Sequence, residues 1–478
     1  MKNYYCNFLV FVTFFMSSLL VYSQEKTWTL EECIDYAIKN NIQVKQYELE
    51  KEAAYLRRQL ALGDFLPALD VSGQHRWTIA DQPDLITNNL SSQTLQSTSL
   101  GLNVNVDIYK GLANHHKMVK ARIDFLASEY KSQQMKENIA LQVINSYLQI
   151  IFNKELVKTN SNQLEYDFSQ EERTKDLVDA GVVPAGDLLE AKATVATSTQ
   201  RLILSENELV MAKLSLAQLL QLESYSTFEV SDSNYEVEND EILAYTPDEI
   251  IERAFDALMN IKIAEANLDI ADRNVKIARS AYHPTIAGFY NFNSSATYAD
   301  RVIGQRATGE STPIGFVNQT NQAVSSPKYQ SVIGGPEAFF DQLSNNKNSV
   351  FGVSISIPVF NGFKVRNNLR LSRLAKEQVE NEKEVAILEL EQQVFRAYTD
   401  TKNALKNYEA SVLTLESREK SLEYAKERYS VGLINIFELN QNQTLFVTAQ
   451  SNMLKSKYDY IFKTRILEYY FGIPLFSN

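Results

Sequence analysis

Apolar and polar residues alternate strictly in two similar segments of the chain. In LGLNVNVDI (residues 100–108) every second residue is aliphatic, and FGVSISI (residues 351–357) follows the same rule after an initial phenylalanine. A period of two is typical of a β-strand that has one apolar face. The pattern therefore predicts strands at residues 98–108 and 349–359.

Two further segments, residues 68–78 and 285–295, alternate less regularly, and Phe289 falls on the polar side of its segment. Each predicted strand has about ten residues, which is the length that crosses a bilayer as a tilted strand. A soluble sandwich with one wet face is the alternative interpretation of this alternation. Four strands are too few to close a barrel, so they must pair with another domain or with another copy of the chain.

After each strictly alternating segment, the spacing of apolar residues changes to three, four or seven, which is typical of a long amphipathic helix. The pattern predicts long helices at residues 112–179 and 363–430, with coiled-coil packing between helices. In the second long helix, the apolar stripe includes Val385, Leu388, Phe395, Val412 and Leu422. Shorter helices are predicted at residues 30–63, 185–222, 247–281 and 436–470.

This order of elements occurs twice, at fixed separations. Gly111 and Gly362 stand 251 positions apart, and so do Gly181 and Gly432. Upstream of the strands the separation is 217, as between Pro67 and Pro284. The two separations differ because the second copy carries a longer loop between its paired strands. An internal duplication decides the architecture more firmly than any local propensity.

The duplication sets the predicted domain boundaries. The first repeat covers residues 24–222 and the second covers residues 246–472, and each contains a helix, two strands, a long helix and a further helix. An acidic linker in an equatorial region, residues 223–245, joins them, and residues 473–478 form a tail. Loops are predicted at residues 79–97 and 296–348. The second loop is rich in Gly, Ser, Asn and Thr, with a short helix predicted within Gly334–Leu343.

Residues 1–23 have the features of a secretory signal peptide. Lys2 precedes the apolar run Phe8–Val21, and small-residue cleavage is expected after Ser23. The run is too short to cross a membrane as a helix, and no other segment is long enough and apolar enough. The mature protein is therefore expected to be exported, and any membrane-spanning part of it must consist of strands.

Charge and composition exclude several functions. A formal net charge of −12 makes nucleic acid an improbable partner. The two cysteines and four histidines show no spacing that suits a metal ion or a disulfide framework. No nucleophile motif or phosphate-binding loop is present, so we expect neither an enzyme nor a cofactor.

The junctions between strand and helix, NVDIYKGL and SIPVFNGF, resemble a signature of the outer-membrane efflux protein family of the TolC type. The helical turns LVDAGVVPAGDLLEAK and RYSVGLINIFELNQNQ resemble its turns, and the likeness covers nearly all of the mature chain. The resemblance implies a mainly α-helical protein with transmembrane β-strands. Three chains would close a 12-stranded barrel in the outer membrane, continued by a long coiled-coil barrel in the periplasm. The strand-to-helix corners would be marked by Gly111, Pro358, Phe360 and Gly362.

The resemblance implies a channel that serves as the passive exit duct of a tripartite efflux pump for small molecules. The exit duct of a type I protein secretion system is an alternative, and a trimeric surface stalk is a further one. The implied partners are two identical chains, a periplasmic adaptor protein and, through it, an inner-membrane pump, with outer-membrane lipid around the strands. The protein would span the outer membrane and extend into the periplasm.

Within the resemblance, two sets of residues receive roles. A periplasmic gate would use Glu438 as an acidic ring, Asp187 as its counterpart and Tyr429 in a polar network. The family's arginine falls at Ile434 and its second ring acid at Gln441, so apolar contact would replace part of the charge. Exposed apolar tips would dock the adaptor through Gly181, Val182, Val183, Pro184, Gly432, Leu433, Ile434 and Asn435. Independently of these roles, both glycines suit helix C-caps, and both acids suit a first helical turn.

Overall fold

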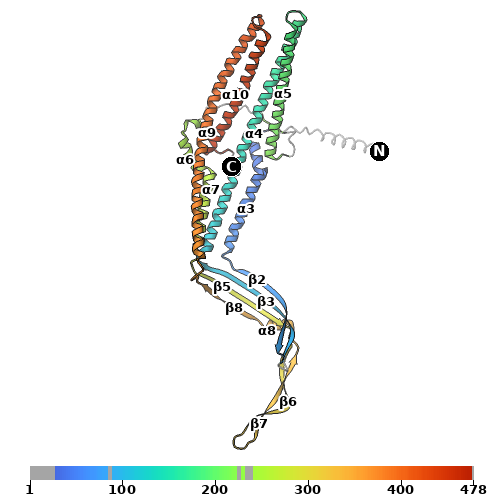
Figure 1. The fold of residues 1–478 in the computed structure, drawn as a ribbon, viewed down its shortest axis with the longest axis vertical. Helices are drawn as coiled ribbons and strands as arrows, with labels where there is room; N and C mark the ends of the chain where they lie inside the picture. The colour runs from blue at the N-terminus through green and yellow to red at the C-terminus, as the bar shows by residue number, and fades with distance from the viewer. Residues whose placement is uncertain (1–26, 84–88, 223–227, 232–240, 476–478) are drawn as a thin grey trace, which may run out of the picture. The chain divides into compact units, whose positions relative to one another are not determined.

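The computed structural model describes residues 27–83, 89–222, 228–231 and 241–475. The predicted signal peptide and most of the predicted acidic linker lie outside these residues. The chain divides into two compact units, and each takes segments from both repeats (Figure 1). The first unit comprises Met1–Tyr55, Ile123–Ile270 and Glu377–Asn478, and the second comprises Leu56–Arg122 and Ala271–Lys376.

The helices confirm the duplication to the residue. In the first repeat they are α2 (Leu30–Asn40), α3 (Ile42–Gly63), α4 (Ala113–Asp179) and α5 (Ala185–Leu220). In the second repeat they are α6 (Pro247–Ala257), α7 (Met259–Ser280), α9 (Lys364–Ser430) and α10 (Ile436–Phe471). Both ends of α2 and α3 recur 217 positions later in α6 and α7, and both ends of α4 and α5 recur 251 positions later in α9 and α10.

One predicted feature of these helices is wrong. Residues 30–63 and 247–281 were each expected to form one helix, but the first is interrupted at Asn41 and the second at Leu258. Asn41 accepts a hydrogen bond from the Gln43 backbone and donates one to the Leu219 carbonyl, which holds its backbone out of the helical region. Both repeats therefore begin with a short helix that can turn away from the longer helix behind it.

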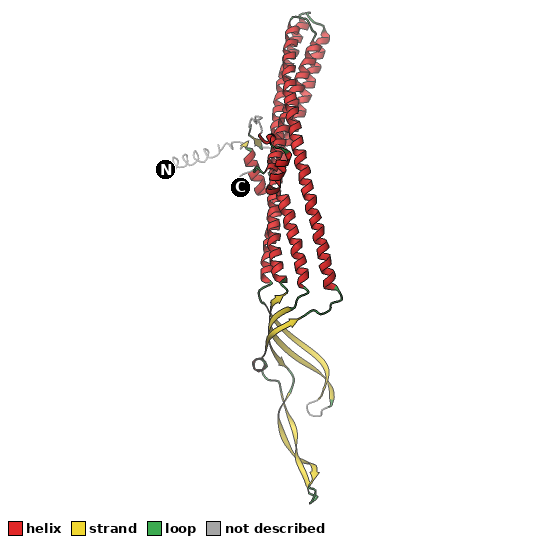
Figure 2. Ribbon diagram, turned by 90° about the vertical axis from the view of Figure 1, so that its left-hand side faces the viewer, coloured by secondary structure: helices red, strands yellow, loops and turns green. Residues whose placement is uncertain are grey.

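Each repeat has its own apolar core in the first unit. The short helix α2 packs beside α4 and α5, and α6 packs beside α9 and α10. Figure 2 shows long helices lying side by side. A capping box begins each short helix, through Thr29 with Glu32 and Thr246 with Glu249. The two cores use matching positions: Cys33, Val143 and Leu216 in the first correspond to Ile250, Val394 and Leu467 in the second.

The predicted apolar stripe of α9 packs only partly within the chain. Leu388 and Phe395 are 63% and 47% exposed, whereas Leu390 and Val394 on another face are buried. The counterpart of Phe395 in α4 is Ile144, which is 3% exposed in an apolar cluster that also includes Tyr458 of α10. One face of α9 is therefore left open where the same face of α4 is covered.

The second unit contains a four-stranded antiparallel sheet in the order β2-β3-β5-β8. Its strands are β2 (Ala68–Pro83), β3 (Leu90–Lys110), β5 (Thr285–Thr297) and β8 (Asn348–Ser356). The first two are longer than predicted and occupy most of the loop expected at residues 79–97. Phe289 lies opposite Asn105 and Gly352, which confirms its place on the polar face.

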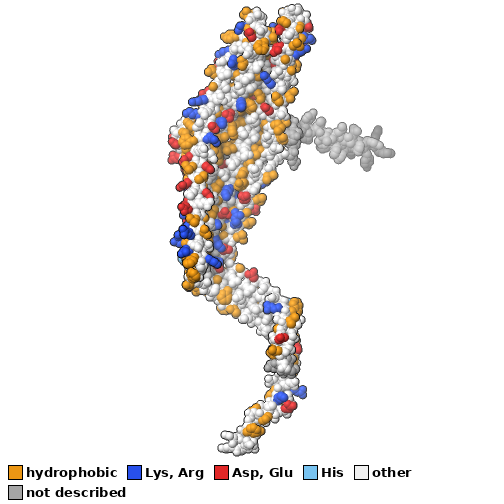
Figure 3. Space-filling view, viewed as in Figure 1, with side chains coloured by type: hydrophobic (Ala, Val, Ile, Leu, Met, Phe, Trp, Pro, Cys, Tyr) orange, Lys and Arg blue, Asp and Glu red, His pale blue; other side chains and the backbone are white. Residues whose placement is uncertain are grey.

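The apolar face of this sheet is open. Val71, Ile79 and Phe351 are 77%, 76% and 79% exposed. Figure 3 shows apolar side chains at the surface of the strands on the face in view. A soluble sandwich would cover such residues with a second layer, so the described chain does not support that alternative.

The long loop predicted at residues 296–348 contains more regular structure than expected. It forms a hairpin of β6 (Arg301–Phe316) and β7 (Ala323–Gly334), followed by α8 (Phe339–Asn345). The short helix predicted within Gly334–Leu343 is therefore present but begins and ends later. Gln342 of α8 bonds to both backbone groups of Thr297 and so holds α8 against β5.

The remaining elements are small. A short parallel pair, β1 (Thr27–Trp28) and β4 (Glu229–Val230), lies beside the first core, and a 3-10 turn, η1 (Glu241–Ala244), precedes α6. Among the helices of the described residues, none is long and apolar enough to cross a membrane.

Candidate functional site

Both turns between a long helix and its successor have the same backbone geometry. At the end of α4, the Gly181 N–H donates to the Val178 carbonyl and the Val182 N–H donates to the Leu177 carbonyl, at 2.9 and 2.8 Å. The end of α9 repeats this pattern around Gly432. Gly181 and Gly432 have φ values of 74° and 77°, so the predicted glycine caps are confirmed as Schellman motifs.

The predicted tip residues separate into exposed and buried ones. Val182 and Leu433 are 67% and 70% exposed. Ile434 is only 9% exposed, because it packs in an apolar cluster with Leu422 and Leu439. Its expected place on an exposed docking tip is therefore wrong.

The other tip residues flank this cluster. Asn435 is the N-cap of α10 and accepts from the Glu438 N–H at 2.9 Å. Pro184 is exposed at the N-cap position of α5, and Val183 is half-buried. Among the predicted tip residues, Val182, Pro184 and Leu433 are therefore exposed apolar groups, whereas Asn435 caps α10.

The two acids predicted at the gate occupy matching positions in the first turns of α10 and α5. The backbone N–H of Glu438 is capped by Asn435, and that of Asp187 donates to the Pro184 carbonyl at 3.0 Å. The helix dipole stabilises negative charge in the first turn, so a structural reason for each acid is present. The side chain of Glu438 remains exposed, and Gln441 is exposed one turn further along.

Tyr429 lies where the two repeats approach each other. It packs against the apolar cluster that contains Ile434 and lies near Tyr166 of α4. The Lys426 ammonium lies 4.9 Å from the centre of the Tyr166 ring. Burial, followed by the neighbouring Asp167 and Tyr429, raises the pKa of Tyr166. The structure therefore connects Tyr429 with α4 of the first repeat.

A group of polar side chains, which we call the inter-repeat seam, joins α4 and α5 to α10. The Gln443 amide donates to Gln163 at 2.6 Å, and the Asn440 amide donates to Thr194 at 3.3 Å. These residues line a hollow of about 370 Å³. Sequence reasoning missed this group, because isolated polar residues on long helices have no distinguishing spacing. The seam comprises Gln163, Asp167, Thr194, Ser198, Asn440 and Gln443.

Asp167 is the buried carboxylate of the inter-repeat seam. It is 4% exposed and accepts hydrogen bonds from Gln163 and Ser198. Burial raises its pKa, although both hydrogen bonds act in the opposite direction. Gln443 retains a buried side-chain oxygen without a partner among the described residues. The two repeats are thus joined here by polar contacts, and each adds only about 0.5–1.5 kcal/mol.

The strand-to-helix corners share a second backbone feature. Gly111 and Leu112 have φ values of 61° and 65°, and Gly362 and Phe363 have values of 62° and 63°. A Cβ on Gly111 would lie 2.4 Å from the Ser280 carbonyl oxygen, whereas one on Gly362 would meet nothing within 4 Å. Pro358 follows the end of β8, and Phe360 is 77% exposed. The first corner is therefore closely packed and the second is open.

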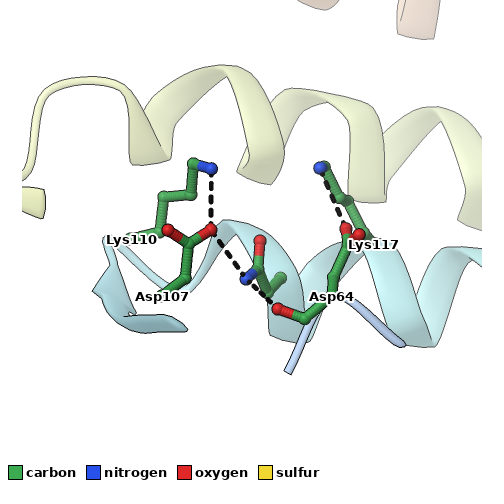
Figure 4. A network of polar contacts seen from close by, with 5 residues as sticks. Asp64, Asp107, Lys110 and Lys117 are labelled. Atoms are coloured by element: carbon green, nitrogen blue, oxygen red, sulfur yellow. Dashed lines mark hydrogen bonds and ion pairs between the residues drawn. The ribbon is translucent and has the colours of Figure 1, made fainter. Parts of the chain in front are cut away.

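A polar network fixes the first corner (Figure 4). The Lys117 ammonium lies 3.1 Å from Asp64, and the Lys110 ammonium lies 2.8 Å from Asp107. The Asn114 amide donates to the Asp64 carbonyl at 3.0 Å. The end of α3, the end of β3 and the start of α4 are therefore joined. No cluster of three or more His, Cys, Asp or Glu in the described parts of the chain could hold a metal ion.

The sequence profile described as outer membrane efflux protein matches residues 33–221 and 250–467, which are the two repeats. The chain belongs to the outer membrane efflux protein family. The curated outer membrane protein TolC of Vibrio cholerae is 20% identical over 463 residues, which cover 94% of this chain and 92% of that protein. Members of the family are channels, and the predicted family, efflux-channel function and outer-membrane location are confirmed.

Solved structures of outer-membrane channels have the same fold as this family member. The Campylobacter jejuni CmeC channel aligns with a TM-score of 0.74 at 16% identity, covering 93% of this chain and 85% of that one. VceC of Vibrio cholerae aligns with a TM-score of 0.72 at 14% identity, covering 93% and 96%. The predicted fold class, long helices combined with a small sheet in a TolC-type arrangement, is confirmed.

Proposed function

We propose that the chain is one subunit of a homotrimeric exit duct, through which a tripartite efflux pump exports small molecules. One observation carries the proposal: the four-stranded sheet has an exposed apolar face and two open edges. Among the described residues, β2 and β8 each pair with a strand on one side only. Unpaired strand edges and exposed apolar faces are both unfavourable in water. Neighbouring copies would pair with the edges, and lipid would cover the apolar face.

Closure by three copies accounts for the number of strands. Three sheets of four strands supply twelve strands. Bacterial outer-membrane barrels have an even number of strands, and the smallest have about eight. The apolar face with Val71 and Phe351 would meet lipid, and the opposite face with Asn103 and Ser354 would line the lumen.

The helices support the same assembly. Leu388 and Phe395 on α9 are exposed, and so are Val210 and Met211 on α5, at 52% and 53%. Apolar stripes of this kind on long helices are typical of coiled-coil interfaces. In the proposed trimer, α9 of one copy would lie against α5 of the next, as the coiled-coil barrel requires.

The partners of the duct would meet it at the helical turns. Exposed Val182 and Leu433 suit the docking of a periplasmic adaptor, and through it of an inner-membrane pump. At the same end, Glu438 and Asp187 would form the acidic gate, with Tyr429 and Gln441 in the surrounding network. The buried Ile434 would contribute to the closed state from within each subunit.

Site-specific photocrosslinking in cells tests this function. A photoreactive residue replaces Leu433, and a matched variant carries it at the buried Ile434 nearby. We expect Leu433 to capture an adaptor of a drug-efflux pump and Ile434 to capture much less. Capture of an adaptor from an ATP-driven protein secretion system would identify the alternative duct. Capture of no adaptor at Leu433, in folded outer-membrane protein, would contradict the docking role.

A further inference from the structure

The start of α9, just after the second strand-to-helix corner, is strongly basic. Residues 364–376 contain five cations and no Asp or Glu: Lys364, Arg366, Arg370, Arg373 and Lys376. The matching segment of the first repeat, residues 113–125, contains three cations and one acid: Lys117, Lys120, Arg122 and Asp124. Because the two repeats share their fold but differ in this charge, the shared fold does not account for it.

Three of these cations form what we call the arginine stripe, which consists of Arg366, Arg370 and Arg373. Their spacing of four and three residues places them on one face of the helix. Arg370 and Arg373 are exposed, and neither forms an ion pair within the described chain. Like charges at this spacing destabilise a helix, and the helix dipole disfavours Arg366 in the first turn of α9. The stripe therefore destabilises the free subunit, and a negatively charged partner would offset that effect.

The other helix ends of the second unit do not supply the missing negative charge. Asp272 of α7 lies 2.7 Å from the Lys276 ammonium and 3.3 Å from that of Lys376. Asp64, just after α3, lies 3.1 Å from the Lys117 ammonium. Both carboxylates are thus engaged with lysines. The arginine stripe therefore suits a negatively charged group from outside the chain.

Apolar residues connect the stripe with the apolar face of the sheet. The alternation of β8 continues past the end of the strand to Ile357 and Val359, which are 64% and 94% exposed. At the corner itself, the ring centres of Phe360 and Phe363 lie 5.7 Å apart. The Arg366 guanidinium lies 4.5 Å from the centre of the Phe363 ring. The exposed apolar series of the sheet therefore leads directly into the arginine stripe.

We infer that the arginine stripe binds the phosphate groups of anionic phospholipids in the periplasmic leaflet of the outer membrane. The protein spans the outer membrane and extends into the periplasm, and the chain leaves the sheet for α9 at this corner. Helical side chains point toward the helix N-terminus, so those of Arg370 and Arg373 are directed back toward the corner. Arg373 stands about 14 Å beyond the start of α9, and its long side chain shortens the distance to the headgroups.

The chemistry of the corner favours a phospholipid over a soluble acidic partner. Arginine binds phosphate through two parallel N–H groups, and each cation beside a membrane strengthens the attraction of anionic headgroups about fivefold. The exposed Val359 and Phe360 would enter the acyl region of the same lipids, as apolar residues of interfacial segments do. A soluble partner bound to the arginines would leave them in water. The inference rests on the proposed contact of the apolar face with lipid, but not on the number of copies or on the exported substrate.

Quenching of a tryptophan at the corner tests the inference in the mature protein, reconstituted in lipid vesicles. The reporter is Phe360→Trp combined with Trp77→Phe, which leaves only Trp28, packed against the first core, as a background signal. The vesicles contain phosphatidylcholine with a fraction of brominated phosphatidylglycerol or brominated phosphatidylcholine, each brominated in the upper acyl chain. The quenching by each lipid gives the affinity of phosphatidylglycerol for the corner relative to phosphatidylcholine.

Two double variants of the reporter protein are compared. With the arginine stripe intact, we expect the affinity ratio to be about five or more in favour of phosphatidylglycerol. Arg370→Gln with Arg373→Gln should lower the ratio toward one. Lys402→Gln with Lys406→Gln removes two exposed cations about 50 Å farther along α9 and should leave the ratio unchanged.

The outcomes separate this inference from the proposed function. An equal ratio with and without Arg370 and Arg373 would mean that the corner touches lipid but does not select its headgroup. No quenching by either lipid would mean that protein, such as a neighbouring copy, covers the corner. Either result overturns the inference and leaves the duct in place if the same vesicles show channel conductance. A lipid preference without conductance would instead contradict the proposed function and leave the lipid site.

Discussion

Gly111 shows how one residue position depends on both conformation and space. Its φ of 61° disfavours a side chain, and a Cβ would lie 2.4 Å from the Ser280 carbonyl oxygen. We expect Gly111→Ala to lower the free energy of unfolding by about 1–3 kcal/mol from backbone strain, with a further cost from the clash. Thermal melting followed by circular dichroism in detergent measures this loss.

Gly362→Ala is the matched control for that substitution. Its φ is 62°, but a Cβ there meets no atom within 4 Å in the single chain. We expect Gly362→Ala to lower the free energy of unfolding of the subunit less than Gly111→Ala does. Both variants carry the backbone strain, but only Gly111→Ala also carries the clash with Ser280. Equal losses for the two variants would show that the contact with Ser280 does not matter.

Asp167 provides a prediction about pH. Burial raises its pKa above the ordinary value of 3.8. Its favourable contribution to stability is complete below the unfolded pKa and is lost as the pH rises through the folded pKa. We therefore expect the melting temperature of the wild-type protein to fall more than that of Asp167→Asn between about pH 4 and pH 7. Glu423→Gln, which removes an exposed acid, is the control, and parallel curves for all three proteins would refute the prediction.

At the scale of elements, the sequence predicted most helices closely because the two copies constrain each other. It missed the interruptions at Asn41 and Leu258, since apolar periodicity continues across both sites. It also missed the β6–β7 hairpin, whose strands are almost wholly exposed and therefore have no burial pattern to reveal them. The exposure expected of the tip residues is confirmed for Val182 and Leu433 and is wrong for Ile434, because three-dimensional packing decides which apolar turn residue is covered; docking at the tips stays a prediction.

The inter-repeat seam marks the limit of sequence reasoning about the candidate site. Asp167 stands on a long helix among many polar residues, and only contact with another helix makes it a buried acid. The roles of Glu438, Asp187, Tyr429 and Gln441 came from family resemblance and remain proposals. Position in the first helical turn explains both acids without a gate, so function must be measured.

The two faces of α9 predict different consequences of substitution. Leu390 is 1% exposed, so Leu390→Ala should destabilise each subunit by about 2–5 kcal/mol. Phe395 is 47% exposed, so Phe395→Ser should change the fold of the subunit little, by about 0.5 kcal/mol or less. Its expected effect is a smaller trimeric fraction, because the exposed face is proposed to meet the next copy.

Light scattering coupled to size-exclusion chromatography measures the trimeric fraction for both α9 variants, and circular dichroism reports their helical content. Retention of the full trimeric fraction by Phe395→Ser would remove this face from the proposed interface. Loss of helical content in that variant would instead assign Phe395 to the core of the subunit.

At the scale of the whole molecule, the duplication allows one kind of contact to be used twice, once between the repeats of a chain and once between neighbouring chains. Helix faces that join the repeats within a chain have exposed counterparts on α9 and α5, and these are proposed to join the chains. A ring built in this way needs no second type of interface, which accounts for the open edges and open apolar faces of the single chain. The regions outside this equivalence, such as the β6–β7 hairpin, are free to differ between the repeats.

The proposed ring brings three copies of Glu438 to one end of the duct, and this convergence can be measured. Exposed carboxylates that converge raise the local concentration of cations and hold multivalent ones most strongly. We expect Glu438→Ala to weaken block of the channel by multivalent cations in planar bilayers. Glu409→Ala is the matched control, since this exposed acid lies on α9 about 30 Å before the turn. Unchanged block in Glu438→Ala, or equal weakening in both variants, would exclude Glu438 from the constriction.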